Sequence, residues 1–159
     1  MAIYMKFGKI DGDATADGHV KWIDLHSVQN GFGRAISTPT GSAQKREASN
    51  PSVSEITCSK TMDRSSPHLF KYSTTGTKGE DCTIDFTRTA EGSDEIYLQL
   101  KLKDTLITSY SISSGGDRPS ESLALNFTDV EVRYTKSGEG NEAGDPVSVG
   151  FDLASGKSR

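Results

Sequence analysis

The chain has 159 residues and a formal net charge of −4 at pH 7, with 33% apolar and 25% charged residues. One domain with a lean apolar core fits this length, because a domain usually spans ~100–200 residues. The negative charge disfavours a general nucleic-acid or membrane-surface binder, since such proteins concentrate positive charge. We see no apolar run typical of a signal peptide or membrane span, so we expect synthesis in the cytoplasm.

The N-terminal part of the chain predicts short strands joined by polar turns. Apolar and polar residues alternate from Ile3 to Phe7, which is the period of a half-buried strand, and a second strand is predicted from Val20 to Val28. A weaker or bulged strand follows between Asn30 and Ser37, because Gly31 and Gly33 interrupt it. Strands and turns therefore occupy the chain before any helix signal.

Residues 37–52 form the longest loop that the sequence predicts. The segment contains Pro39, Gly41 and the pair Asn50-Pro51 around a basic centre. A loop of this length inside a compact domain is usually functional or mobile, and two interpretations stay open. It is either a disordered surface loop or a loop that a partner chain orders.

The middle of the chain predicts a strand followed at once by a short helix. Apolar residues alternate from Ile56 to Met62, but Lys60 falls on the apolar side, so we expect this strand to be exposed at one end. The sequence Ser65-Ser66-Pro67 favours a helix start, and Gly76 can end the helix in the left-handed conformation. A lone short helix is unstable by itself, so it should pack on the end or side of the strands.

The second half of the chain predicts strands and turns. Apolar positions alternate strictly from Ile96 to Leu102, and further strands are predicted around Ile84 and from Val147 to Leu153. Between Leu123 and Tyr134 the apolar residues switch from odd to even positions. Such a switch within one strand predicts a bulge or kink, here near Thr128-Asp129.

About eight or nine strands and one helix predict a single domain over residues 1–159. The expected fold class is mainly β: an antiparallel two-sheet β-barrel or sandwich with one short α-helix at its side. Residues 154–159 are expected to form a flexible tail. Cys58 and Cys82 each fall on the apolar side of a predicted strand, so we predict two buried thiols rather than a disulfide.

The sequence predicts no catalytic residue, no cofactor and no metal site. Neither a Gly-x-Ser-x-Gly nor a His-Glu-x-x-His signature occurs, and Gly156-Lys157-Ser158 lacks the rest of a phosphate-binding loop. The segment from Asp13 to Asp24 approximates a calcium loop, but Thr15 replaces a usual ligand and both flanks predict strands instead of helices. The three histidines are dispersed, which disfavours zinc. We therefore expect a protein that is not an enzyme.

Two blocks of sequence resemble a known family. The first block, residues 59–69, is SKTMDRSSPHL, and the second, residues 115–134, contains GGDRP followed by ESLALNF. The alternating strand from Ile96 to Thr108 and an Asp-x-x-x-Asp-Gly-His segment near the N-terminus also fit. In order and spacing, these elements resemble over nearly the whole chain the haemolysin-coregulated protein (Hcp) family, the inner-tube protein of the bacterial type VI secretion system.

The resemblance implies homohexameric rings with a wide channel, stacked into a secreted tube that can carry effector proteins. The implied partners are further copies of the chain, the spike, sheath and baseplate proteins of the machinery, and effectors in the lumen, with no nucleic acid and no membrane insertion. Location would be cytoplasmic, then secreted without a signal peptide. Gln29 is implied to face the lumen. Lys45, Arg46 and Glu47 lie in the loop implied to contact a neighbouring subunit or ring.

A monomeric β-barrel that binds a carbohydrate or a protein is the alternative. It would predict aromatic residues clustered at one end of the barrel, whereas residues such as Tyr4, Trp22 and Tyr97 are dispersed along the chain. A ring of identical chains instead needs an interface between two different faces of the same chain. Strand edges and the 37–52 loop are natural sources of such faces.

Overall fold

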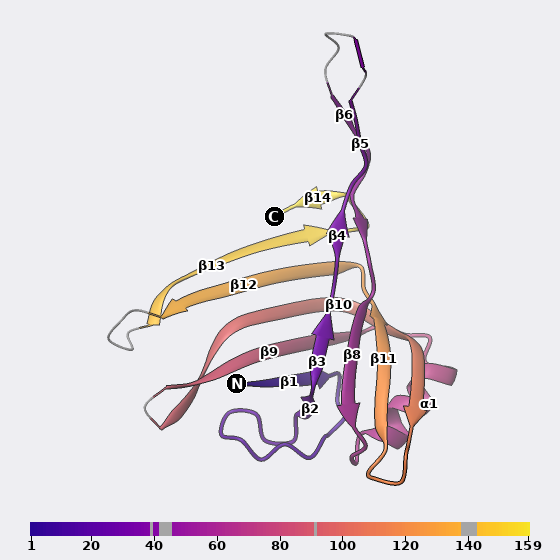
Figure 1. Cartoon of the computed structure of the whole chain (residues 1–159), viewed down its shortest axis with the longest axis vertical. Helices are drawn as coiled ribbons and strands as arrows, with labels where there is room; N and C mark the ends of the chain where they lie inside the picture. The colour runs from indigo at the N-terminus through magenta and orange to yellow at the C-terminus, as the bar shows by residue number, and fades with distance from the viewer. Residues whose placement is uncertain (39, 42–45, 91, 138–142) are drawn as a thin grey trace.

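The computed structural model describes residues 1–38, 40–41, 46–90, 92–137 and 143–159 (Figure 1). Over these ranges the chain forms fourteen strands and one helix. The strands make two antiparallel sheets, named sheet A and sheet B below, and a narrow projecting arm (Figure 1). The predicted fold class, mainly β with one short helix at the side, is confirmed.

One long strand, β10, belongs to both sheets. In spatial order, sheet A contains β14 (Lys157–Ser158), β13 (Ala143–Asp152), β12 (Asp129–Ser137), β10 (Ser93–Ser113), β9 (Glu80–Ala90), β1 (Ala2–Phe7) and β2 (Ile23–Leu25). Sheet B contains β10, β11 (Ser120–Asn126), β8 (Ile56–Thr61) and β3 (Ser27–Gln29). Residues 98–103 of β10 pair with β12, and residues 106–113 pair with β11. The strand therefore turns a corner from one sheet into the other.

The sheets meet at a second corner, where the chain steps from β2 to β3. There the His26 backbone N–H donates to the Ser59 carbonyl oxygen at 2.7 Å, which ties the step to sheet B. Sheet A also carries β12, β13 and β14 on the far side of β10 from β9. The described strands thus form an open sandwich, which is one of the two predicted arrangements, and they close no barrel.

The core lies between the inner faces of the two sheets. Along β10, Leu100 and Leu102 are buried while Lys101 is exposed, as the alternation predicted. Cys58 and Cys82 are buried and unpaired, which confirms that prediction. Burial raises the pKa of Cys58 to about 12, so this thiol stays protonated near neutral pH. Other fully buried core residues are Met5, Phe7, Ile23, Ile56, Leu69, Ile84, Leu123 and Leu125.

The helix α1 (Ser66–Thr75) begins where the sequence predicts. Its end differs from the prediction, because Gly76 has an extended conformation with φ −70° instead of a left-handed one. Glycine is needed there for close approach: a Cβ atom would lie 2.5 Å from the Tyr72 carbonyl oxygen. At ten residues α1 is short, and within the described ranges no helix is long and apolar enough to cross a membrane.

One further prediction is corrected near the C-terminus. The parity switch is a break between two strands rather than a bulge within one, since β11 ends at Asn126 and β12 begins at Asp129. At the break, the Thr128 N–H donates to the Lys103 carbonyl oxygen at 3.1 Å. The flexibility expected of residues 154–159 stays a prediction. In the structure this segment contains β14, which pairs with β13, and the Arg159 N–H donates to the Gly150 carbonyl oxygen at 2.7 Å.

The predicted 37–52 loop is largely part of the arm, which projects from one end of the sandwich (Figure 1). Two short ladders build it: β4 (Phe32–Gly33) pairs with β7 (Ser52–Val53), and β5 (Ile36–Ser37) pairs with β6 (Glu47–Ala48). The weak strand predicted between residues 30 and 37 is the first half of this arm. Antiparallel pairing, instead of an unstructured loop, therefore carries the described part of this segment away from the core.

Candidate assembly surfaces

Sheet A leaves part of its inner face uncovered. Along β12 and β13, Val132 pairs with Val149 and Tyr134 pairs with Val147, on the same side of the sheet as the buried Val130. Sheet A extends past sheet B here (Figure 1), and Tyr134, Val147 and Val149 are 50%, 65% and 56% exposed. These three residues are named the overhang. A contiguous apolar surface of this kind marks an interaction site, because water disfavours it.

A second apolar surface lies on the opposite side of the molecule, where α1 packs against the end of β10 (Figure 1). Phe70 of α1 and Ile112 of β10 are 56% and 53% exposed. Tyr110 connects them, since its ring centroid is 6.2 Å from that of Phe70 and it shares a strand face with Ile112. Phe70, Tyr110 and Ile112 are named the helix patch.

The arm exposes apolar and basic side chains together. Phe32 and Ile36 are about half exposed, and Arg34 is exposed. Two-residue ladders are not stable by themselves, so the arm gains stability if it contacts another surface. The predicted loop contacts lie here: the Arg46 Nε–H donates to Thr38 Oγ1 at 3.3 Å, and the backbone of Glu47 pairs with Ser37. Lys45 lies outside the described residues.

The outer face of sheet B carries hydroxyl and amide groups in place of charges. Gln29 is exposed on β3 opposite Thr57, at the end of this face. In the paired registers that the structure describes, the outward residues of sheet B are Ser27, Gln29, Thr57, Ser59, Thr61, Leu106, Ser109, Ser111, Ser113, Ser120, Ser122, Ala124 and Asn126. None of these side chains is ionisable near neutral pH. Hydrogen bonding, and not net charge, is therefore what this face offers a ligand.

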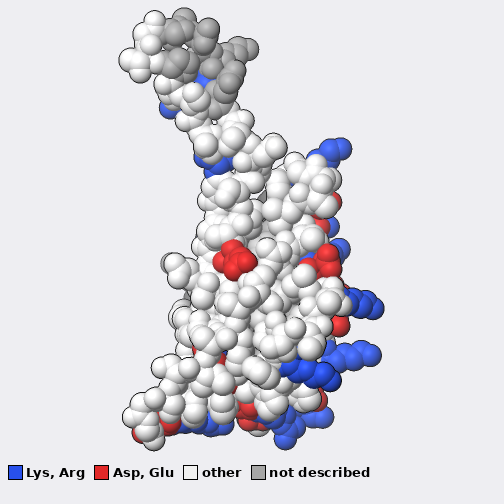
Figure 2. All heavy atoms as spheres, turned by 90° about the vertical axis from the view of Figure 1, so that its right-hand side faces the viewer, with Lys and Arg blue, Asp and Glu red and all other residues white. Residues whose placement is uncertain are grey.

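The outer face of sheet A has the opposite character. Lys101 pairs with Glu131, and Lys103 pairs with Asp129, so outward side chains of opposite charge face each other across β10 and β12. In the view of Figure 2, Lys, Arg, Asp and Glu gather along one edge and at the lower end, while the opposite edge above that end is nearly free of charge. The outer face of sheet A can therefore make ionic contacts, whereas the outer face of sheet B can only make hydrogen bonds and apolar contacts.

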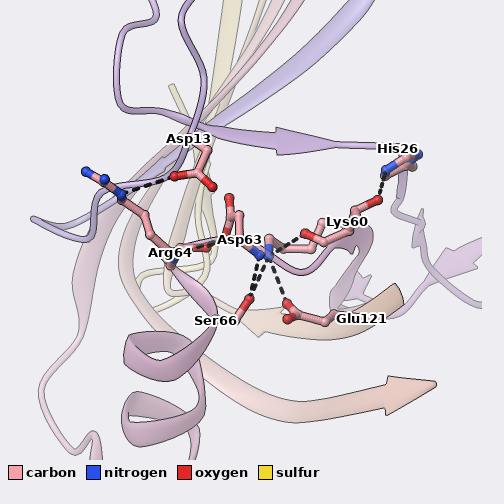
Figure 3. A network of polar contacts seen from close by, with 9 residues as sticks. Asp13, His26, Lys60, Asp63, Arg64, Ser66 and Glu121 are labelled. Atoms are coloured by element: carbon pink, nitrogen blue, oxygen red, sulfur yellow. Dashed lines mark hydrogen bonds and ion pairs between the residues drawn. The ribbon is translucent and has the colours of Figure 1, made fainter. Parts of the chain in front are cut away.

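A buried lysine joins helix α1 to sheet B (Figure 3). Lys60 is fully buried, and its Nζ lies 2.8 Å from Glu121 Oε2 and 3.0 Å from Asp63 Oδ1. The same ammonium donates to the Thr61 carbonyl oxygen at 3.0 Å and to Ser66 Oγ at 3.3 Å. Strands β8 and β11 and the first turn of α1 therefore meet at one cation. The prediction that Lys60 lies at an exposed strand end is wrong.

The sequence did contain a signal for this cluster. In the register of β8 and β11, Lys60 pairs with Glu121, and each residue falls on the apolar side of its strand. Opposite charges at inward positions of two strands predict a buried ion pair, once the two strands are known to be neighbours. Tyr110 lies beside the pair, and burial, with a smaller effect of Glu121, raises the pKa of Tyr110 to about 12.

A second buried cluster fastens the N-terminal loop to the outer face of sheet A. His19 Nε2 is 2.8 Å from Asp85 Oδ2, and Gln99 Nε2 donates to Asp85 Oδ1 at 2.8 Å. The His19 ring also stacks on Tyr4 at 4.6 Å and meets Trp22 edge-on at 4.7 Å. The His19 and Asp85 side chains are only 5% and 3% exposed, so this pair serves packing and cannot reach a substrate in solution.

The acidic loop that approximates a calcium site lies between β1 and β2, and so strands flank it. Asp13 Oδ1 is 3.1 Å from Arg64 Nε (Figure 3). Burial, followed by the nearby Asp63 carboxylate, raises the pKa of Asp24. In the part of the chain that the structure describes, no three His, Cys, Asp or Glu side chains are arranged to hold a metal ion.

An open sandwich with uncovered apolar faces and a projecting arm has the features of a subunit built for assembly. The family model described as "Type VI secretion system effector, Hcp" matches residues 4–134. The chain belongs to this family, which confirms the resemblance predicted from residues 59–69 and 115–134. It is therefore a type VI secretion tube or effector protein, and the family is one of structural secreted proteins, not of enzymes.

Known relatives agree over almost the full chain. Protein hcp1 of Pseudomonas aeruginosa is 28% identical over 155 residues, which cover 95% of this chain and 94% of the relative. A structure of a type six secretion system protein superposes with a TM-score of 0.92 at 24% identity, covering 99% of both chains. Hcp1 from Salmonella typhimurium gives 0.81 at 24% identity, covering 99% of this chain and 98% of its own. At these identities the two structures support the fold alone.

Proposed function

We propose that this chain is the subunit of a type VI secretion inner tube and that it forms homohexameric rings. The overhang is the observation that carries the proposal. Tyr134, Val147 and Val149 continue the core face of sheet A into solvent, so a further copy of the chain is needed to cover them. Family membership implies self-assembly in type VI secretion. The closed ring of six copies is our proposal.

In the proposed ring, the outer face of sheet B lines the channel and Gln29 faces the lumen. An uncharged hydroxyl surface would let effector proteins of either charge be held, because it neither attracts nor repels them electrostatically over a distance. The charged outer face of sheet A would then face the sheath. Spike and baseplate proteins would contact the ends of the tube. The subunit would be made in the cytoplasm and secreted by the machinery without a signal peptide.

The arm is proposed to join one ring to the next. It projects from one end of the sandwich and carries exposed Phe32, Ile36 and Arg34, which suit contact with another protein surface (Figure 1). Lys45, Arg46 and Glu47 belong to this proposed stacking contact.

The direct test of the proposal is light scattering of the purified chain behind a size-exclusion column, with negative-stain images. A species of about six times 17.1 kDa that appears as hollow rings supports the tube subunit. A monomer that persists at high concentration contradicts the proposed ring. It would favour the alternative, a monomeric barrel-like module that binds a carbohydrate or a protein.

Deleting residues 42–48 is expected to weaken the stacking of rings while the rings themselves persist. The deletion removes β6 but leaves β4, β7 and both sheets in place, so circular dichroism should still show a folded chain and light scattering should still give six copies per ring. Electron microscopy under conditions in which the unmodified chain forms tubes provides the measurement. Tubes of unchanged length would show that the arm has no role in stacking.

A further inference from the structure

We infer that the ring closes by seating the helix patch of one copy on the overhang of the next copy. The inference rests on the proposed function and adds the two surfaces that meet. Identical subunits in a closed ring make head-to-tail contacts, so each chain needs two different, mutually complementary surfaces. The overhang and the helix patch lie on opposite sides of the sandwich, which is the placement that such a contact requires (Figure 1).

The overhang lacks the layer that sheet B supplies elsewhere. In the core, the inner face of sheet A packs against inner residues of sheet B such as Leu123 and Leu125. Tyr134, Val147 and Val149 belong to the same inner face but are half exposed or more, while the adjacent Phe86 and Leu98 are half-buried. An occupant that covers this surface must therefore present an apolar layer at the position of a missing sheet B.

The helix patch presents a layer of that kind. Tyr110 pairs with the buried Leu123, and Ile112 pairs with the buried Glu121, so both residues lie on the inner face of sheet B. Helix α1 covers this face only in part, because Phe70 and Ile112 remain about half exposed. On the side of the overhang, no sheet B layer covers the inner face of sheet A. On the side of the helix patch, inner-face residues of sheet B remain exposed.

The Lys60 cluster keeps the helix patch in a fixed shape. Its ammonium holds Ser66 in the first turn of α1 and Glu121, the strand partner of Ile112. A surface that is already ordered loses little conformational entropy when it binds, which favours a tight contact. The arm also exposes apolar residues, but it projects from the end of the sandwich, so it is the alternative occupant that the test must distinguish (Figure 1).

Two ring-breaking variants, mixed together, test the pairing. Val149→Asp places a charge on the overhang and Ile112→Asp places one on the helix patch, and both side chains are more than half exposed, so the variants should fold. Each variant alone is expected to be monomeric. Ser148→Asp is the matched control, because Ser148 is an exposed neighbour of Val149 on the outer face of β13, and it should still form rings.

An equal mixture of the two variants is expected to give a heterodimer of about twice 17.1 kDa and nothing larger, because one intact overhang can bind one intact helix patch. Rings that persist in either variant, or a mixture that stays monomeric, would overturn the pairing while leaving the tube proposal standing. An unmodified chain that never forms rings would overturn both. Circular dichroism of each variant separates a lost contact from a lost fold.

Cross-linking gives an independent measurement that needs no ring to be broken. A chain with Ile112→Cys and Val149→Cys, treated with a short bis-maleimide, should give a ladder of covalent oligomers that ends at six subunits. Chains with only one of the two changes should give no ladder. Cys58 and Cys82 are buried, so they do not compete for the reagent. A double variant that stays uncross-linked in assembled rings would contradict the contact.

Discussion

Replacing Lys60 by methionine is expected to lower the free energy of unfolding by about 3–5 kcal/mol, the usual effect of removing one partner of a buried ion pair. Lys60 and the Glu121 side chain have no exposed surface, and 2.8 Å separates the Lys60 Nζ from Glu121 Oε2. Without the ammonium, the Glu121 carboxylate is left buried and uncompensated. Urea unfolding at pH 7, followed by circular dichroism, measures the change.

Two further variants identify the cause of the loss. Lys101→Met removes an exposed lysine from β10 and should change the free energy of unfolding by no more than about 0.5 kcal/mol. Lys60→Met combined with Glu121→Met should recover much of the stability, because an apolar pair avoids the cost of burying two charges. Asp63 would keep its hydrogen bond from the Ser65 N–H at 2.9 Å. A single Lys60→Met variant as stable as the natural chain would refute the role given to this cluster.

The local pattern of the sequence predicted the elements that depend on neighbouring residues. The burial of Leu100 and Leu102 around the exposed Lys101, the helix start at Ser66 and the burial of Cys58 and Cys82 all follow from side chains a few positions apart, and all are confirmed. The alternation predicted from Ile96 is wrong at its start, because the strand register shifts between Ile96 and Leu98 and leaves Ile96 exposed. The cause is physical: strand faces have a period of two, so composition along a strand reports which face is buried.

The features that the sequence did not predict depend on which strands become neighbours. Lys60 is buried because β8 pairs with β11, which brings Glu121 opposite it from a position 61 residues away. The overhang exists because β10 pairs with β9 on one side and with β12 on the other, so that sheet A extends beyond the edge of sheet B. Tyr134 and Val147 therefore carry an inward pattern without a layer to cover them. Local alternation predicts such residues as core, and only the sheet order shows that they are exposed.

The predicted site residues also divide into those that the sequence could indicate and those that depend on which strands become neighbours. Gln29 was placed by resemblance, and the structure puts it on the exposed outer face of sheet B, which is compatible with a lumen position that stays a proposal. Arg46 and Glu47 lie in the arm instead of an unstructured loop. The overhang and the helix patch were not predicted, although family resemblance had predicted that such faces must exist.

Replacing Leu125 by aspartate is expected to prevent folding. Leu125 is fully buried in the middle of sheet B, where it pairs with Ile56 on β8 and Ile107 on β10. A carboxyl group in this apolar core has no partner. Even in its protonated form it adds the cost of an unpaired polar group to the lost packing of leucine, and together these costs are comparable with the ~5–15 kcal/mol by which a domain of this size is usually stable. Solubility, circular dichroism and urea unfolding of the purified variant provide the measurement.

The neighbouring position supplies a control with the same new charge. Asn126 is exposed and points to the opposite face of β11, so Asn126→Asp should fold cooperatively with a change of no more than about 0.5 kcal/mol. A contrast between adjacent positions can come only from the face on which each side chain lies, because a shift of one residue exchanges the two faces of a strand. If Leu125→Asp unfolded cooperatively from a soluble native state, the register of β11 would be wrong. The inner-face positions of Ile112 and Glu121, on which the proposed ring contact depends, would then have to be assigned again.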